Sequence, residues 1–271
     1  MHGSSRVAAA KGQAALDAAL VPGADWNVLA EDLFGIVGAL DRSASLRRAL
    51  ADPSREGDVK RDLAARLFGG KVGVAATSVI TALASQRWSE DRDLSDTVEA
   101  LAVQTVLAQA ERDGRIDAVE DELFRFERTV AGNAALRDTL SGRNTDAAGK
   151  SGLVGRLLEG RAAPETVRLA QQAVSAPRGR RLDRTLDAYL ALAATRRDQL
   201  TAVVTAAFDL TEQQSARLVS ALEGVYGKSI NLQTVIDPDV MGGIHVQVGD
   251  EVVDGTILRR LDGARRHVSG S

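Results

Sequence analysis

The sequence contains no cysteine among its 271 residues. Disulfide bonds, thiol nucleophiles and cysteine-ligated metals are therefore excluded. Histidine is almost as scarce, because His2, His245 and His267 are the only three and they lie far apart in the sequence. This scarcity argues against a histidine-rich metal site and against a Ser-His-Asp triad. We accordingly predict no catalytic residue, no metal and no cofactor.

An excess of charge and long apolar runs are also missing. The chain has 34 Lys and Arg against 37 Asp and Glu, a formal net charge of −3, whereas a nucleic-acid-binding domain is usually clearly basic. No stretch approaches the roughly 18 consecutive apolar residues that span a bilayer, and the N-terminal segment lacks the leucine-rich core of a signal peptide. We expect a soluble chain that reaches a membrane only through a partner.

The residues that are abundant favour helices. Hydrophobic residues make up 44% of the chain, aromatic residues make up only 3%, and proline occurs five times. Alanine, leucine, valine and arginine dominate. Such a composition can bury a core and is typical of helical bundles.

An internal repeat occupies much of the chain. Residues 31–70 and 121–160 align without a gap at an offset of 90, and a shared helical composition alone would not keep that register. The repeating unit is longer than a solenoid repeat, so each copy should be a domain. The identical pairs are Leu33/Leu123, Phe34/Phe124, Ala44/Ala134, Leu46/Leu136, Arg47/Arg137, Leu50/Leu140, Lys60/Lys150, Leu63/Leu153, Arg66/Arg156, Leu67/Leu157 and Gly70/Gly160.

The hydrophobic period within each copy is helical. Leu33, Ile36 and Leu40 fall at i, i+3 and i+7, the spacing of one helix face. We predict two tandem helical bundles at residues 1–100 and 101–200, each with five or six short helices.

The pattern changes after about residue 200. Short β-branched and alternating segments predict strands, including residues 228–237 and 243–248. Thr211 and Gln214 form the capping-box pattern of a helix start. The predicted order is β-α-β-β-β-α, so residues 201–271 should form a small α+β domain. The predicted fold class is therefore mainly α with a small α+β C-terminal domain.

The glycine-rich stretch 237–255 superficially resembles a phosphate-binding loop. Gly242 and Gly243 are followed by Ile-His-Val, without the lysine of a Walker loop or the G-x-G-x-x-G of a dinucleotide site. These glycines flank alternating strand residues, where they serve turns or a bulge. We therefore interpret the stretch as structural.

About sixty residues of this C-terminal region resemble the δ subunit of F-type ATP synthases, which is related to the oligomycin-sensitivity-conferring protein. Residues from about 100 onward would make one δ subunit of ordinary length, and the first 95 or so resemble the extra bundle of duplicated actinobacterial δ polypeptides. We expect the residues that carry the match to be structural. They are Leu210, Thr211, Asp237, Pro238, Gly242, Gly243, Ile244, Gly249, Asp254, Gly255, Thr256, Arg259 and Leu261.

This resemblance implies a noncatalytic stator subunit. A helical bundle would accept N-terminal helices of α subunits, and the C-terminal domain would hold the C-terminal ends of the b-subunit stalk. The resemblance also implies a peripheral location on the cytoplasmic face of the cell membrane, within the ATP synthase complex. Which bundle copy binds an α subunit stays open. The alternatives are a helical-repeat scaffold or nucleic-acid-binding protein unrelated to ATP synthase, or an enzyme with an unrecognised polar site.

A few further residues have plain structural interpretations. We expect Trp26 and Trp88 in the core. We expect Lys60 and Lys150 to snorkel, with the aliphatic stem buried and the ammonium in solvent. The basic run at residues 178–184 is interleaved with acid, and we expect a solvated helix face or a stalk contact there.

Overall fold

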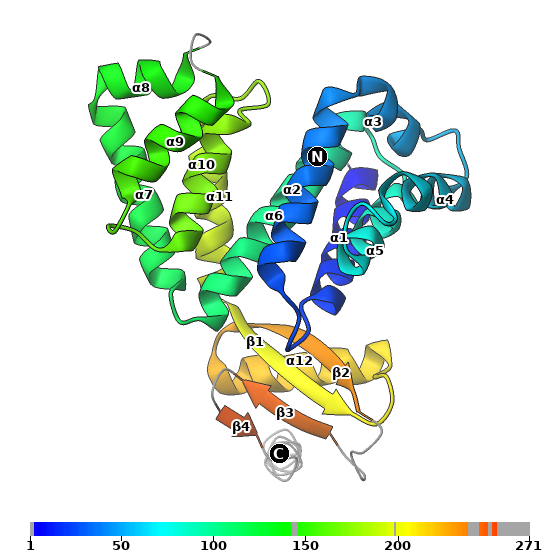
Figure 1. The fold of residues 1–271 in the computed structure, drawn as a ribbon. Coiled ribbons are helices and arrows are strands. Elements are labelled where there is room, and N and C mark those ends of the chain that lie inside the picture. Colours follow the sequence, from blue (N-terminus) through cyan, green and yellow to red (C-terminus); the bar gives the residue numbers. More distant parts are fainter. Residues whose placement is uncertain (1–2, 143–145, 198, 238–243, 249–250, 254–271) are drawn as a thin grey trace. The chain divides into compact units, whose positions relative to one another are not determined.

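The computed structural model describes residues 3–142, 146–197, 199–237, 244–248 and 251–253 (Figure 1). Within these residues the chain is mainly helical and ends in a small mixed sheet, which confirms the predicted fold class. It forms two compact units, residues 1–195 and 196–271. The helices are α1 (Gly3–Ala19), α2 (Trp26–Arg42), α3 (Ala44–Ala51), α4 (Gly57–Phe68), α5 (Val74–Ala84), α6 (Asp91–Arg112), α7 (Ile116–Gly132), α8 (Ala134–Ser141), α9 (Ala147–Leu158), α10 (Pro164–Ser175), α11 (Leu182–Arg197) and α12 (Glu212–Tyr226).

The internal repeat is a repeat of structure. Helices α7, α8, α9 and α10 begin 90 residues after α2, α3, α4 and α5, as the differences 116−26, 134−44, 147−57 and 164−74 show. We call α1–α5 the first helical segment and α7–α11 the second. The two copies therefore fold into the same succession of helices.

Equivalent side-chain caps start α3 and α8. The Ser43 hydroxyl accepts a hydrogen bond from the Leu46 backbone N–H at 3.2 Å. Ninety residues later, the Asn133 side chain accepts from the Leu136 N–H at 3.0 Å. Serine and asparagine both satisfy the otherwise unpaired N–H groups of a first turn, so this helix start survives the substitution.

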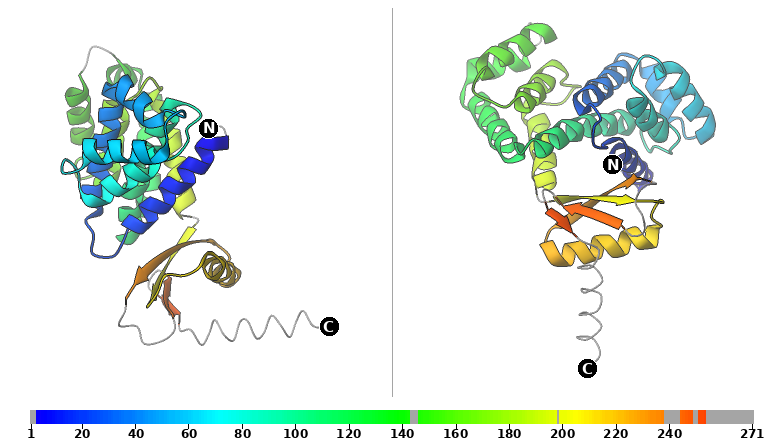
Figure 2. Two further views of the ribbon diagram at one scale, coloured as in Figure 1. Left: turned by 90° about the vertical axis from the view of Figure 1, so that its right-hand side faces the viewer. Right: turned by 60° about the horizontal axis from the view of Figure 1, so that its bottom comes forward.

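Helix α6 belongs to both segments. Residues 5, 8, 12 and 16 of α1 are buried, and so are residues 95, 98, 102 and 106 of α6, which lie 90 positions later. Helix α6 is therefore the counterpart, in the second segment, of α1 in the first. It also packs along α2 in the first segment, and the views in Figure 2 show it running from one segment into the other.

Burial on several faces distinguishes α6 from the amphipathic surface helices around it. Its buried residues include polar Ser95, Thr97, Glu99 and Thr105 beside many apolar ones. A helix that is buried all round belongs to a core. We predicted the boundary between the two bundles between residues 100 and 101. Both residues lie inside this shared helix.

Predicted core positions are confirmed. Leu33, Ile36 and Leu40 have at most 1% of their surface exposed, and Trp26 and Trp88 are also buried. Pro164 occupies the first turn of α10, where its missing N–H costs nothing.

The C-terminal unit is a four-stranded sheet in the order β2-β1-β3-β4 (Figure 1). Strand β1 pairs in parallel with β2, and β1/β3 and β3/β4 are antiparallel. Leu218 and Leu222 of α12 pack with buried strand residues such as Val204 and Val246. The predicted order is confirmed through β4, and the predicted final helix lies outside the described residues. The strands are β1 (Gln199–Ala206), β2 (Ser229–Ile236), β3 (Ile244–Val248) and β4 (Glu251–Val253).

Candidate functional site: a buried ion-pair network and a cavity in the helical unit

The loop between α10 and α11 directs an arginine inwards. Arg178 has a φ of 53° and Gly179 a φ of 77°, so two successive residues adopt the left-handed conformation that most side chains avoid. The Arg178 side chain is only 4% exposed. The strained turn thus places a guanidinium in the interior of the helical unit.

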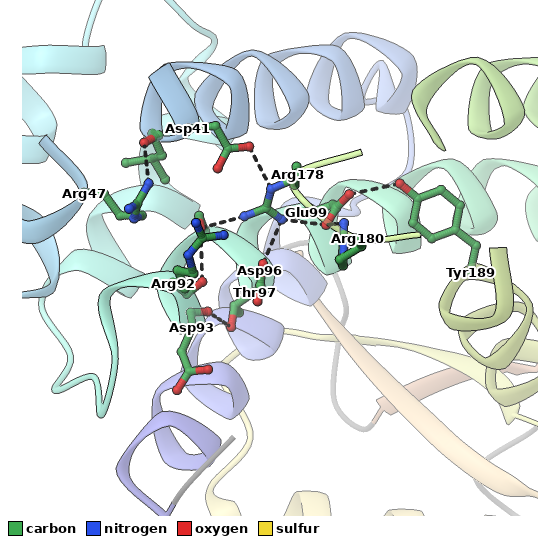
Figure 3. A network of polar contacts seen from close by, with 12 residues as sticks. Asp41, Arg47, Arg92, Asp93, Asp96, Thr97, Glu99, Arg178, Arg180 and Tyr189 are labelled. Carbon is green, nitrogen blue, oxygen red and sulfur yellow. Dashed lines mark hydrogen bonds and ion pairs between the residues drawn. The ribbon is translucent and has the colours of Figure 1, made fainter. Parts of the chain in front are cut away.

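Arg178 binds residues from two helices (Figure 3). Its Nε donates to Asp41 Oδ2 at 2.7 Å, at the end of α2. Its Nη1 donates to Glu99 Oε2 at 2.6 Å, and its Nη2 donates to the Ser95 hydroxyl at 2.6 Å, both on α6. Asp96 is ion-paired with Nη1 at 2.9 Å. A planar guanidinium with five N–H groups can satisfy several acceptors at once.

Glu99 is the second hub of this cluster. Its carboxylate is 3% exposed, is ion-paired with Arg180, and accepts a hydrogen bond from the Tyr189 hydroxyl at 3.1 Å. Burial, and then the Glu99 charge, raise the pKa of Tyr189 well above its ordinary value. Burial also raises the pKa of Asp96, against the opposing effect of Arg178. The Arg178 network consists of Asp41, Ser95, Asp96, Glu99, Arg178, Arg180 and Tyr189.

The network ties the first segment, the shared helix and the second segment together, and a further contact does the same. The guanidinium of Arg168 on α10 lies 4.3 Å above the Phe34 ring of α2 and pairs with both carboxylate oxygens of Glu31. Ion pairs and stacking therefore cross between the copies at two places.

Our expectation of a solvated face or stalk contact at residues 178–184 is wrong for Arg178. Arg181, with 82% of its side chain exposed, does fit a solvated position. The sequence carried a signal that we did not use: Pro177 and Gly179 flank Arg178 and break the helix, so this arginine lies in a loop and can turn inwards.

A cavity of about 480 Å³ lies in the second segment. Its floor is apolar and its rim carries charges of both signs. Lys150 lines it and has 8% of its surface exposed. The lining residues are Glu127, Val130, Ala131, Arg137, Asp138, Leu140, Ser141, Lys150, Ala173, Val174, Pro177, Arg180, Arg181, Leu182, Asp183 and Leu186.

The matching lysine of the first segment has a different environment. Lys60 is fully buried, and its Nζ donates to the Gln86 carbonyl at 2.6 Å. Burial lowers the pKa of Lys60. Our expectation that the Lys60 ammonium reaches solvent is therefore wrong, because this ammonium is hydrogen-bonded to a backbone carbonyl inside the protein.

Four of the predicted signature residues lie in the described part of the chain. Thr211 caps α12 in a complete capping box with Gln214, and Leu210 packs against the core of the sheet unit. The Asp237 N–H donates to the Ala206 carbonyl at 2.9 Å, and Ile244 opens β3 opposite Ala206. The others, Pro238, Gly242, Gly243, Gly249, Asp254, Gly255, Thr256, Arg259 and Leu261, lie outside the described residues.

The described residues contain neither a candidate metal site nor a candidate membrane span. No three or more histidine and acidic side chains are grouped so that they could hold a metal ion. None of the helices there combines the length and the apolar character that crossing a bilayer requires.

Comparison with known proteins found extensive similarity. The sequence pattern of the family described as "ATP synthase delta (OSCP) subunit" matches residues 102–268. ATP synthase subunit delta of Kineococcus radiotolerans is 48% identical over 269 residues, which cover 99% of this chain and 98% of the relative. The proteins of that name from Streptomyces avermitilis and Streptomyces griseus are 47% and 45% identical, over 99% and 100% of this chain and 98% and 100% of their own length.

Proposed function

Because the chain belongs to the ATP synthase delta (OSCP) subunit family, we propose that its helical unit holds N-terminal helices of α subunits and that its sheet unit holds the C-terminal ends of the b-subunit stalk. The chain is a noncatalytic, structural component of the peripheral stalk of an F-type ATP synthase.

The observation that carries this proposal is the full-length similarity. Relatives named ATP synthase subunit delta align with 98–100% of their length, whereas the family pattern begins only at residue 102. The first segment is therefore part of the delta subunit in these relatives too. We propose three functional parts, residues 1–100, 101–200 and 201–271, with α6 serving both helical parts.

The internal contacts of the helical unit suit a part that transmits force. A stator must hold the catalytic head against rotation, so its own segments should not slide past one another. The Arg178 network and the Arg168–Glu31 pair join the two copies through side chains with several simultaneous bonds. Charge-assisted bonds of this kind are stronger than neutral ones and directional.

The place of action follows from the complex. We propose that the chain is peripheral on the cytoplasmic face of the cell membrane and is held there by its partners. The signature residues have structural roles in this proposal: Thr211 starts α12, and Leu210 and Ile244 complete the core of the sheet unit.

Selective capture by the full chain tests the proposal. The tagged chain is co-expressed with the α and β subunits and, separately, with the soluble part of the b subunit. Deleting the N-terminal helix of the α subunit should abolish capture of the head and leave capture of b intact. Removing residues 196–271 should have the reverse effect. Capture of the head that persists without the α-subunit helix would contradict the assignment.

A further inference from the structure

The cavity in the second segment exists because the second copy lacks bulk that the first copy has. Ala173 lines the cavity, whereas the residue 90 positions earlier is Leu83, which is fully buried. Val130 likewise replaces the buried Leu40. In the first segment, Trp88 is buried against α5, with its indole N–H bound to the Leu83 carbonyl at 3.0 Å.

The corresponding loop of the second copy, residues 176–181, contains no tryptophan. Its Arg178 turns into the network with Glu99 and Asp41. The left-handed turn at Arg178 and Gly179 therefore joins the segments and at the same time leaves the hollow unfilled.

Two cations of the repeat have partners in the first copy. Lys60 donates to the Gln86 carbonyl, and Arg47 on α3 donates to Asp91 Oδ2 at 3.0 Å. Both bonds hold α3 or α4 to the chain around the start of α6.

The same two cations lack these partners in the second copy. Lys150, at the position of Lys60, is more than nine-tenths buried and lines the cavity, and its ammonium has no hydrogen bond or ion pair within the described residues. Arg137, at the position of Arg47, lines the same cavity, and within the described residues its side chain bonds only the Ala131 carbonyl, at 3.4 Å. The loop before α11, residues 176–181, contains three arginines and no acidic residue that could replace Asp91.

We propose that this cavity receives an aspartate or glutamate side chain, flanked by aliphatic residues, from another polypeptide of the ATP synthase complex. The acidic group would bind Lys150 Nζ and Arg137, and the aliphatic neighbours would cover Val130, Leu140 and Leu186. The Lys150 ammonium has no ion pair among the described residues, and a carboxylate in the cavity would form a charge-assisted bond with it.

A polypeptide fits this cavity better than a free anion. Glu127 and Asp138 on the rim have no ion pair among the described residues. They would repel a small anion at the entrance. They would attract basic residues that lie near the proposed aspartate or glutamate in the partner polypeptide. The choice of source rests on the proposed function, because a peripheral-stalk subunit works among other subunits. The site uses α7–α11 and leaves the sheet unit free.

Photo-crosslinking in the assembled complex tests this inference. The photoreactive amino acid p-benzoylphenylalanine replaces Ser141, which is exposed on the rim of the cavity. We expect a crosslink to another subunit, next to an acidic residue with aliphatic neighbours in its sequence. The same amino acid at Thr129, which is exposed on α7 and does not line the cavity, is the control and should not reach that segment.

Two further variants test whether the crosslink depends on the Lys150 charge and on the open cavity. Lys150→Met keeps the apolar stem and removes the charge, and it should lower the yield of the crosslink roughly tenfold to a hundredfold. Ala173→Leu fills the cavity with the residue of the first copy and should have the same effect while the charge stays. The matched Lys60→Met variant should leave the yield unchanged.

Each outcome is decisive. Crosslinks only within the chain or to lipid, or a yield that Lys150→Met and Ala173→Leu both leave unchanged, would overturn the inference. Head and stalk subunits in the same preparation are measured first. If they do not assemble with the wild-type chain, the proposed function fails. If they assemble and no Lys150-dependent crosslink forms, only the cavity inference fails.

Discussion

Arg178 donates its Nη1–H to Glu99 Oε2 at 2.6 Å across 79 residues of sequence. The same guanidinium reaches Asp41, which is 137 residues away. One side chain from the second segment thus holds both the shared helix and the first segment. The stability of the helical unit should depend on it more than on any arginine at its surface.

Replacing Arg178 by methionine should destabilise the helical unit by about 3–5 kcal/mol, because Glu99 and Asp96 would stay buried without their cation. Urea unfolding followed by circular dichroism measures this. Arg181→Met is the control. Arg181 and its partner Asp183 are both exposed, so this substitution should change the free energy of unfolding by less than about 1 kcal/mol. Equal effects of the two substitutions would contradict a structural role for the network.

Replacing Tyr189 by phenylalanine should cost about 1 kcal/mol at neutral pH through the lost bond to Glu99. It should also change the response to alkali. The pKa of Tyr189 is raised above its ordinary value of 10.0. A group with a raised pKa contributes its stability below the unfolded value and loses it as the pH rises through the folded value. Above about pH 10 the wild type should therefore lose more stability than Tyr189→Phe.

Ultraviolet titration gives an independent readout of the same tyrosine. The chain has two tyrosines, so the difference between the wild type and Tyr189→Phe isolates one phenol. Ionisation of that phenol at an ordinary pH would refute its burial against Glu99.

Leucine-to-alanine replacement should be costly in the first copy, and the reverse change should be tolerated in the second. Leu83→Ala opens a cavity in a filled core and should cost about 3–5 kcal/mol. Ala173→Leu enters an existing cavity of about 480 Å³ and should cost less than about 1 kcal/mol or stabilise the fold. Thermal and urea unfolding compare them. A large loss in Ala173→Leu would mean that the hollow is not available to a side chain.

Each helical segment should need α6 to fold. A fragment of residues 91–197 keeps α6, and we expect it to be helical and to melt cooperatively. A fragment of residues 113–197 lacks α6 and should be largely unfolded, because the buried faces of α7 and α10 lose their support. The pair 1–113 and 1–90 tests the first segment in the same way. Cooperative folding of both short fragments would show that the copies are independent.

The capping box at Thr211 gives a prediction for the sheet unit. Its hydroxyl accepts from the Gln214 N–H at 3.3 Å, and its own N–H donates to the Gln214 side chain at 2.9 Å. Thr211→Ala should destabilise the unit by about 1 kcal/mol. Thr211→Ser keeps the hydroxyl and should recover most of that loss, as measured by thermal unfolding.

Local features of the fold were predictable from the sequence. Leu33, Ile36 and Leu40 lie on one buried face of α2, since helical spacing alone decides which residues can share a face. The Thr211–Gln214 cap and the β3–β4 pairing likewise depend on residues close together in the chain. The repeat was visible because the same side chains recur at a fixed offset.

The roles of buried charges were not predictable in this way. Lys60 and Lys150 match in sequence, yet one binds a carbonyl and the other lines a cavity. The carbonyl that Lys60 binds belongs to Gln86, 26 residues away, and the cavity beside Lys150 is also lined by the distant Ala173. A pattern within one segment contains no information about the space left by another.

The sequence by itself determined the helices, their caps, the duplication and the family, because each depends on the order of residues along the chain. Tertiary structure alone decided that α6 is shared, that Arg178 is buried and that the second copy has a cavity beside Ala173, where the first copy has the buried Leu83. These features depend on which helices face one another. Packing satisfies or leaves open each buried charge only after distant residues meet.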